Sequence, residues 1–296
     1  MERDSFLYNI RRKCQVIAHK VMPDEFLSKL YFKIVMKKKL NLNNPKTFNE
    51  KLQWLKLNYM PNNELIIQCT DKYEVRKYIK NKGYSKKLVP ILGVWSDPRN
   101  INWDYLPEKF VLKCNHGCAY NIVISDKNKV KKTEIINQLT SWLKEDFGAF
   151  NVEPHYSAIK NHLITCEKFL GECIVDYKFF CFNGDPKYIY VSNNMIHDRE
   201  AQIGFFYLDG TKMPLRRDDY MDIENVTFPI FFEEMQAMAK DLAKDFPFVR
   251  VDFFLADNTF YFAELTFTPC ACMMPFNPEN YDIEWGKILD IDNLIN

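Results

Sequence analysis

The segment with the most chemically versatile residues runs from Phe248 to Pro269 and has the sequence FVRVDFFLADNTFYFAELTFTP. Its alternation of polar and apolar residues predicts a β-hairpin with two polar residues at the turn. The hairpin places Arg250 and Asp252 on one face of its first strand, and Glu264 and Thr266 on one face of its second. Charged side chains in so apolar a hairpin are costly unless they are paired or bind a ligand.

Asp252 and Glu264 would lie on adjacent strands, where two carboxylates can share a hard cation. Mg²⁺ is commonly held by one or two carboxylates together with substrate phosphates. The planar fork of Arg250 matches phosphate oxygens, so the hairpin favours phosphate chemistry. A purely structural pair between Arg250 and a carboxylate is the alternative.

The elements that must position this hairpin are helices in the first part of the chain and antiparallel strands in the second. Thr47 and Glu50 fit a capping box at a helix start. Apolar periodicity predicts helices over 5–60, 71–79, 133–147 and 231–242, and strands over 88–95, 110–113, 164–170, 176–182, 187–191 and from 205. Helices followed by antiparallel strands predict the α+β class.

Arg-x-Asp followed twelve residues later by Glu-x-Thr resembles the nucleotide–magnesium hairpin of ATP-grasp enzymes. The chain is similar to the TupA-like ATP-grasp family, named for teichuronopeptide synthesis, in FNEKLQWLK (48–56), DKYEVRKY (71–78), FVLKCNHG (110–117), DYKFFCFNG (176–184), FPFVRVD (246–252) and ELTFTP (264–269). The resemblance implies an α+β ATP-grasp fold, in which two α+β subdomains clasp ATP, behind a helical and basic N-terminal region.

The implied domains are a helical region over 1–70, a first ATP-grasp subdomain over 71–166 with a flexible phosphate-covering loop, and a second over 167–296 with the hinge and the metal-binding hairpin. By the same resemblance, ATP would be bound by Lys72, Lys113, His116, Gly117, Glu167, Lys168, Phe169, Leu170 and Lys178. Lys72 and Lys113 would contact phosphates, while residues 167–170 would present their backbone to the adenine edge. For Lys178, an ion pair with Asp176 is the alternative.

The catalytic residues implied are Arg250, which would steady the transferred phosphoryl group, and Lys113. Asp252, Glu264 and Thr266 would hold Mg²⁺, with Thr266 standing where many ATP-grasp enzymes carry asparagine. Two residues are assigned to the substrate, Arg199 and Thr268. A plain surface loop is the alternative for Arg199.

Two loops depart from the family pattern. Cys118-Ala119 stands where the family has Ser-Gly, and Cys270-Ala271-Cys272 stands where it has Gly-Ser-Gly. Because Ala and Cys restrict positive φ, we expect these loops to be the least transferable part of the resemblance. A second interpretation is a metal site built from cysteines and a histidine of the two loops, Cys114, His116, Cys118, Cys270 and Cys272, although their spacing matches no standard zinc pattern.

The implied activity is an ATP-dependent carboxylate–amine ligase of bacterial surface-polysaccharide or cell-wall polymer synthesis. It would join an amino acid or amine to a uronic acid or an acidic side chain through an acyl phosphate. An ATP-dependent sugar phosphotransferase, a glycosyltransferase and a non-catalytic nucleotide-binding protein are the alternatives.

The charge distribution suggests where such a protein would act. The 296 residues carry a net charge of +1, but residues 1–60 contain 13 Lys and Arg against 5 Asp and Glu, and residues 241–296 contain 3 against 10. A basic region suits an anionic partner such as an acidic or lipid-linked saccharide, or it is a solvated helical face. No nucleic-acid signature, bilayer-spanning apolar run or secretory signal is present. We therefore expect a cytoplasmic protein with reduced cysteines, or one peripheral at the inner membrane surface.

Overall fold

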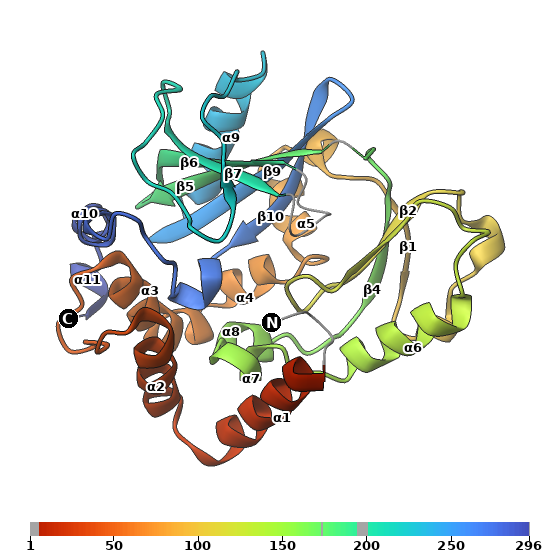
Figure 1. The fold of residues 1–296 in the computed structure, drawn as a ribbon. Helices are drawn as coiled ribbons and strands as arrows, with labels where there is room; N and C mark the ends of the chain where they lie inside the picture. Colours follow the sequence, from red (N-terminus) through yellow and green to blue (C-terminus); the bar gives the residue numbers. More distant parts are fainter. Residues whose placement is uncertain (1–5, 173, 194–200, 296) are drawn as a thin grey trace.

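The computed structural model describes residues 6–172, 174–193 and 201–295. Its strands form two sheets, a four-stranded sheet at the right of Figure 1 and a six-stranded sheet in its upper part, with helices packed around both. The class is α+β, as predicted.

The helices are α1 (Phe6–Val21), α2 (Asp24–Met36), α3 (Phe48–Asn58), α4 (Glu64–Thr70), α5 (Val75–Asn81), α6 (Lys132–Leu143), α7 (Gly148–Asn151), α8 (Pro154–Ser157), α9 (Phe232–Ala243), α10 (Asn280–Ile288) and α11 (Asp292–Ile295). The strands are β1 (Ile91–Trp95), β2 (Phe110–Cys114), β3 (Asn121–Ile124), β4 (Ile164–Lys168), β5 (Val175–Phe182), β6 (Asp185–Asn193), β7 (Gln202–Tyr207), β8 (Met221–Asp222), β9 (Phe248–Ala256) and β10 (Thr259–Thr266).

The smaller sheet has the order β1-β4-β2-β3, and all of its pairings are antiparallel. Successive side chains of a strand point to opposite faces. Phe110 and Leu112 of β2 are therefore buried in one core cluster with Leu139 and Trp142 of α6. Val111 and Lys113 belong to the other face, which is turned away from α6.

The larger sheet has the order β10-β9-β5-β6-β7-β8, and only its β7–β8 pairing is parallel. On β5, Phe179 stacks on Phe232 of α9, whereas Phe180 and Phe182 contact Trp285 of α10. Helices thus cover both faces. The alternation continues toward the start of β5, where Lys178 shares the α10 face with Phe180 and Phe182 but lies beyond the aromatic core.

Most predicted elements are confirmed, with shifted ends. The capping box at Thr47 and Glu50 is formed, and both turn residues of the β9–β10 hairpin, Asp257 and Asn258, have positive φ. The helix predicted from residue 71 begins only at Val75, because Asp71 caps a turn instead. The strand predicted to return after residue 210 is reduced to a single bridge between Phe206 and Lys212.

Helix α3 packs into the same core as the large sheet. Phe48 at its start contacts Trp285 of α10 edge to face at 5.4 Å between ring centroids. The approach of the two helices is close because Gly286 has no side chain: a Cβ atom there would lie 2.2 Å from the Lys46 carbonyl oxygen. The Asp282 carboxylate of α10 also accepts the backbone N–H of Asn49 at 2.9 Å.

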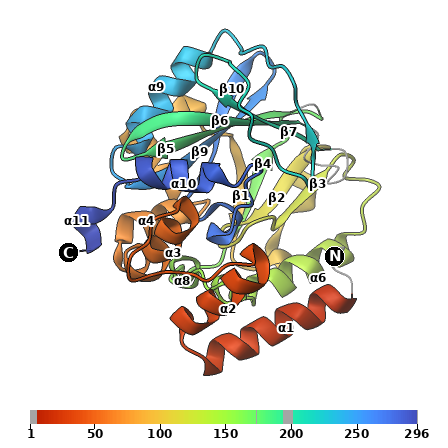
Figure 2. The same ribbon diagram turned by 60° about the vertical axis from the view of Figure 1, so that its left-hand side comes forward.

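Helices α1 and α2 lie at the periphery, below both sheets in Figure 2. Helix α1 packs against the short helix α7, and α2 contacts α1 and α3. Of the helices in the described parts of the chain, none is long and apolar enough to cross a bilayer.

Candidate functional site

A hollow of about 560 Å³ lies between the two sheets and receives side chains from both. The small sheet and the segment after it supply most of its wall, and the large sheet supplies the rest: Val89, Val111, Lys113, Ala119, Asn121, Val123, Glu167, Lys168, Phe169, Leu170, Gly171, Glu172, Ile174, Asp176, Lys178 and Phe254. Six residues predicted for ATP binding, Lys113, the 167–170 segment and Lys178, therefore line one pocket.

The inner wall of this pocket is apolar. Val89 and Leu170 are buried in a small hydrophobic cluster, against which Ile174 and Phe254 pack. Phe254 extends from β9 on the face that also carries Asp252, so one strand supplies both apolar wall and charge. Such a wall can bury a flat ring, while polar groups at its edge fix the orientation of that ring.

Lys113 and Glu167 form an ion pair across β2 and β4 with an Nζ–Oε2 distance of 2.5 Å. Both side chains are mostly buried, and the Lys113 ammonium also lies 5.6 Å from the centroid of the Phe254 ring on the opposite wall. Lys168 follows on the exposed side of β4, where its backbone N–H donates to the Pro90 carbonyl. The ammonium of Lys113 thus sits where the apolar wall meets the polar edge.

Beside this pocket, the hairpin carries a compact cluster of charges. The guanidinium of Arg250 donates to both carboxylate oxygens of Asp252 at 2.8 and 2.6 Å. Lys178 donates to the same carboxylate at 3.3 Å and to Asp176 at 2.9 Å. Lys178 and Asp176 also line the pocket, so the charge cluster and the pocket are continuous.

Glu264 faces Asp252 directly across the hairpin and completes the cluster. Lys72 donates to Glu264 at 2.9 Å, Arg250 lies 3.6 Å away, and the Thr266 hydroxyl donates at 3.1 Å. Burial alone would raise the pKa of Glu264, but Lys72, Arg250 and Lys178 outweigh it and hold this pKa well below its usual range. Burial raises the pKa of Asp252, and Arg250 and Lys178 offset part of that shift.

These two carboxylates fit a magnesium ion that also binds phosphate oxygens. Mg²⁺ sites of that kind need only one or two protein carboxylates. Among the residues that the structure describes, no three His, Cys, Asp or Glu side chains come together as a metal-binding group. A cation at Asp252 and Glu264 would therefore depend on ligands from a bound substrate, and Arg250, Lys178 and Lys72 neutralise the two carboxylates in the structure described here.

Lys72 is placed by a buried hydrogen-bond network around Asn115. The Asn115 side chain donates to the Asp71 carboxylate at 2.6 Å and to the Asn161 carbonyl at 2.9 Å, and accepts from the backbone of Leu163 at 2.7 Å. The backbone carbonyl of Asn115 also accepts the backbone N–H of Lys72 at 3.0 Å. The motifs 71–78 and 110–117 are thereby joined at one point, through residues 44 positions apart in the sequence.

His116 and Gly117, also predicted to bind ATP, have other surroundings. The His116 ring is buried, stacks on His162 at 3.6 Å between centroids, and bonds to the Trp142 carbonyl at 3.0 Å. Burial lowers its pKa to about 4. A Cβ on Gly117 would lie 2.6 Å from the Tyr120 ring, so packing requires this glycine. Neither residue lines the pocket between the sheets, and their contact with ATP stays a prediction.

Of the two residues predicted for the substrate, Thr268 does not line the pocket between the sheets. Arg199 lies outside the described residues. Thr268 is buried, and its hydroxyl donates to Glu153 at 2.6 Å. Burial raises the pKa of Glu153 and lowers that of the neighbouring Lys56, whose ammonium donates to the Asn151 carbonyl. Thr268 thus belongs to a buried polar group behind the hairpin.

Both loops in which alanine or cysteine replaces glycine keep the backbone that glycine would favour. Ala119 has a φ of 59°, and Cys270, Ala271 and Cys272 have φ values of 51°, 54° and 61°. These residues therefore adopt a positive φ that residues with a Cβ disfavour, and the expectation that the two loops are the least transferable part of the resemblance stays a prediction. Left-handed backbone costs a residue with a Cβ about 1–2 kcal/mol, so each of these positions is strained.

The cysteines of these loops are in contrasting environments. Cys114 and Cys272 are buried, and burial raises the pKa of Cys114 to about 12. Cys118 and Cys270 are exposed, and the Arg217 guanidinium donates to the Cys270 sulfur at 3.3 Å. The interpretation as a shared metal site has no support among the described residues.

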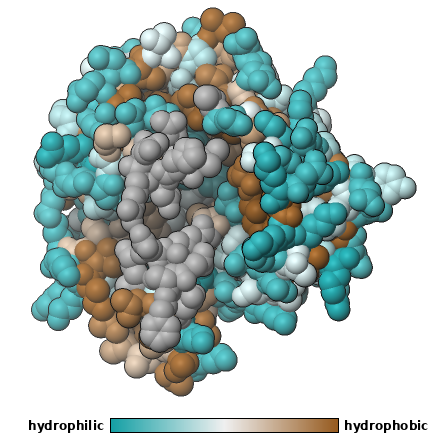
Figure 3. All heavy atoms as spheres, turned by 45° about the vertical axis from the view of Figure 1, so that its right-hand side comes forward, coloured by the Kyte–Doolittle hydropathy of each residue, from teal (hydrophilic) through white to brown (hydrophobic). Residues whose placement is uncertain are grey.

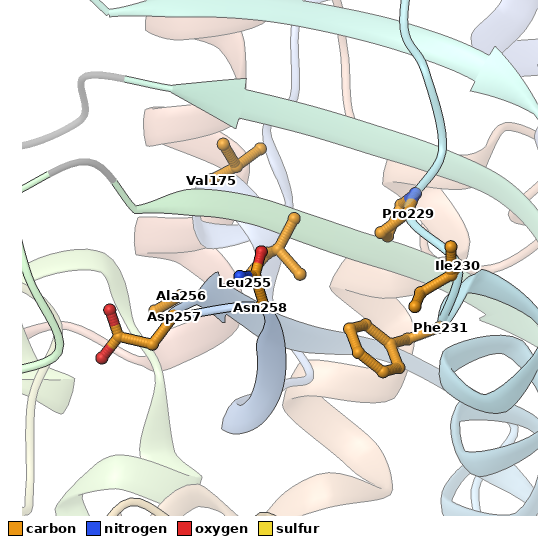
Figure 4. Close-up of a pocket in the computed structure, with 8 residues that line it drawn as sticks. All are labelled: Val175, Pro229, Ile230, Phe231, Leu255, Ala256, Asp257 and Asn258. Carbon is orange, nitrogen blue, oxygen red and sulfur yellow. The ribbon is translucent and has the colours of Figure 1, made fainter.

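A second hollow of about 440 Å³ lies at the tip of the hairpin (Figure 4). Val175 and Leu255 form one side of it, and Pro229 to Phe231 form the other. Among the described residues that line it, Asp257 alone is charged, and it would repel phosphate. The pocket between the sheets, rather than this one, combines an apolar wall with cations.

Several residues of the site were not singled out by the sequence. The resemblance indicates an ATP contact for His116 but no role for its neighbour Asn115. Asp176 is indicated only as an ion-pair partner of Lys178. Val111 could have been found by extending the strand alternation from Lys113, whereas the alternation of the hairpin already assigns Phe254 to the face of Arg250 and Asp252. Arg217 had no such signal, because only the tertiary structure brings it to Cys270.

Comparison with solved structures finds ligases of low sequence identity. The D-alanine–D-alanine ligase of Bacillus anthracis complexed with ATP is 15% identical, over 69% of this chain and 56% of that chain, with a TM-score of 0.39. The corresponding Helicobacter pylori ligase is 16% identical over 85% and 69% of the two chains, with a TM-score of 0.44. The L-amino acid ligase of Bacillus licheniformis is 14% identical over 68% and 43%, with a TM-score of 0.38. The chain thus spans little more than half the length of the Bacillus anthracis ligase.

Comparison with curated proteins gives no match. The family model for the TupA-like ATPgrasp domain, in contrast, matches residues 50–290, which include the whole pocket and the charge cluster. Since that match covers most of the sequence, this chain belongs to the TupA-like ATP-grasp family, and its α+β fold is an ATP-grasp fold.

Proposed function

We propose that this protein is an ATP-dependent carboxylate–amine ligase. The observation that supports it best is the continuity of pocket and charge cluster: Lys178 lines the apolar pocket and also binds Asp252 of the hairpin. An adenine in the pocket would have its phosphates directed toward Lys113, Lys178 and Arg250. ATP is the nucleotide proposed, with residues 167–170 at the adenine edge.

The chain's own side chains would position and neutralise the phosphates. Phosphoryl transfer depends mainly on alignment and charge stabilisation, which Lys72, Lys113 and Arg250 can supply. Asp252 and Glu264, with Thr266 between Arg250 and Glu264, would hold Mg²⁺, which when bound neutralises phosphate charge. Arg250 would exchange part of its pairing with Asp252 for the transferred phosphoryl group.

The proposed reaction has two steps. An oxygen of the substrate carboxylate attacks the γ-phosphorus of ATP, and the bond to the β-phosphate oxygen breaks, which yields an acyl phosphate and ADP. The nitrogen of an amine then attacks the acyl carbon, phosphate leaves, and the amine loses a proton, which leaves an amide. We propose a uronic acid or an acidic side chain as the carboxylate, in bacterial surface-polysaccharide or cell-wall polymer synthesis at the inner membrane surface.

Formation of ADP with a panel of uronic acids and amino acids tests this proposal, with hydroxylamine added to trap the acyl phosphate as a hydroxamate. Glu264→Gln is expected to lower turnover by at least about 100-fold, because it removes a charge that acts on the phosphate centre. Glu279→Gln is the matched control, since Glu279 is exposed at the N-terminus of α10, where it forms an ion pair with Lys38. It should leave turnover unchanged.

Three outcomes would contradict the ligase. A stable phosphorylated sugar formed without an amine would identify a phosphotransferase. Consumption of a nucleotide sugar would identify a glycosyltransferase. A thermal shift by MgATP without any turnover across the panel would favour a non-catalytic nucleotide-binding protein.

A further inference from the structure

Helix α1 exposes a row of apolar side chains. Leu7, Ile10, Ile17 and Val21 recur with Cys14 at spacings of three and four residues, and all five are exposed. Val21 keeps 71% of its surface exposed. Residues at this spacing lie on one face of a helix, so the row forms a continuous apolar stripe.

The other face of α1 is anchored to the protein, which fixes the direction of the stripe. Arg12 forms an ion pair with Glu145 at 2.6 Å, donates to the hydroxyl of Tyr120 at 2.6 Å, and lies 3.6 Å from the centroid of the Phe150 ring. At 100° per residue, position 12 is nearly opposite the centre of the row from Leu7 to Val21. The stripe therefore points away from the molecule.

Helix α2 adds a second apolar row. Phe26, Leu30 and Ile34, four residues apart, are exposed, and Phe26 keeps 54% of its surface. Leu27 and Phe32 are buried and hold α2 in place. Brown and tan spheres gather along the lower edge of Figure 3, the level at which Figure 1 draws α1.

Basic side chains border both rows. Lys13 and Lys20 flank the α1 stripe on one side and Arg11 on the other, and Lys33 lies beside the α2 row. All four are exposed and form no ion pair with another residue that the structure describes. Acidic residues within 6–36 are limited to positions 24 and 25.

We propose that α1 and α2 form a docking surface for an anionic phospholipid bilayer. An amphipathic helix with lysine and arginine beside its apolar stripe lies in the plane of a membrane interface, with its apolar side chains among the acyl chains and its cations at the head groups. The uncompensated positive border favours an anionic lipid surface over a neutral one. This inference deepens the membrane location in the proposed function, but vesicle binding is measured without turnover, so either can fail alone.

Co-sedimentation of the full chain with vesicles tests the docking surface. We expect binding to vesicles of equimolar phosphatidylglycerol and phosphatidylcholine, weakened by salt, and little binding to phosphatidylcholine alone. Lys13→Gln with Lys20→Gln should lower the partition coefficient about 30-fold, since each lysine near an anionic surface contributes roughly fivefold. Ile17→Ser with Val21→Ser should lower it at least about tenfold through lost apolar insertion.

Ile230→Ser is the matched control, because Ile230 is 92% exposed in the loop before α9 and far from α1 in sequence. It should bind vesicles as the unsubstituted protein does, and all variants should keep their melting temperature. Equal binding by the α1 variants would overturn the proposal. Absence of vesicle binding together with dimers that depend on α1 in sedimentation analysis would also overturn it, because the occupant would then be a second copy of the chain. Absence of vesicle binding together with α1-dependent binding to soluble polygalacturonate would do the same, because the occupant would then be an acidic saccharide.

Discussion

The residues of the charge cluster on the hairpin, which we propose to bind phosphates, form a nearly balanced set of charges. Arg250, Lys178 and Lys72 face Asp252 and Glu264, and each carboxylate accepts hydrogen bonds from at least one cation. Ion pairs that are taken out of water are stable only while both partners remain. A bound nucleotide and metal would have to replace these contacts, so the cluster is preorganised for exchange of its partners.

Lys113 is expected to bind ATP through its charge at the end of the apolar wall. Lys113→Met should weaken MgATP binding about 10- to 100-fold, since a hydrogen bond to a charged group contributes about 1.5–3 kcal/mol. Isothermal titration with a non-hydrolysable ATP analogue measures this change. Lys129→Met is the matched control, because Lys129 is exposed, pairs with Asp126 and does not line the pocket. An equal loss in both variants would remove the specific role of Lys113.

Ala119 is expected to gain stability on replacement by glycine. Its φ of 59° is strained for alanine, and glycine adopts this backbone without that cost. Ala119→Gly should therefore raise the free energy of unfolding by up to about 1 kcal/mol, after allowance for the more flexible unfolded chain. Ala237→Gly, on the exposed side of α9, should instead lower it by about 1 kcal/mol. Urea denaturation compares the two, and effects of the same sign would argue against strain at Ala119.

The contacts between elements explain why residues in separate motifs act together. Asn115 follows β2, Asp71 precedes α5, and their side chains meet at 2.6 Å, which places Lys72 beside the hairpin. Because Asn115 is wholly buried, its side chain can form these hydrogen bonds in only one geometry. The segment before α5 is thereby held against the end of the small sheet.

Asn115→Ala is expected to disrupt that junction. It should lower the free energy of unfolding by about 3 kcal/mol, because it leaves the buried Asp71 carboxylate without one of its donors. MgATP binding should also weaken, since Lys72 loses its support. The exposed Asn128→Ala should change neither quantity by more than about 0.5 kcal/mol. Normal stability of Asn115→Ala would show that the network has no such role.

In the whole molecule, the two sheets carry the pocket and the charge cluster, and the helices α1 and α2 lie at the periphery. The small sheet and the segment after it contribute Lys113 and residues 167–170, the large sheet contributes Asp176 and Lys178, and the proposed nucleotide pocket is complete only where they meet. Because the fold buries polar groups between these parts, its stability depends on pH.

His116 and His155 are both buried, and burial lowers their pKa values to about 4 and about 3. The unfolded chain binds a proton at each histidine below about pH 6.5, whereas the folded chain does not, so the free energy of unfolding should fall as the pH drops from 6.5 to 4. The expected slope is roughly 1.4 kcal/mol per pH unit for each histidine. His155→Asn should lessen this slope in urea denaturation, whereas Ala237→Gly should keep it. An unchanged slope in His155→Asn would contradict the prediction.

The strand alternation and the pairing of the hairpin followed from the order of residues along the chain. Because side chains alternate along a strand, Arg250, Asp252, Glu264 and Thr266 could be assigned to one face from their spacing alone, and the structure places them together. The capping box and the two polar residues at the hairpin turn were predicted for the same reason, since both depend on only a few consecutive residues.

Tertiary structure alone decided which residues at the ends of strands face the pocket. Asn115 supports Lys72 while His116 is buried beside His162, Thr268 turns inward to Glu153, and Ala119 enters the pocket wall with a strained backbone. Each of these outcomes depends on contacts between segments far apart in the chain. The periodicity of apolar residues along the sequence does not predict such contacts, because they depend on how the two sheets and their helices pack.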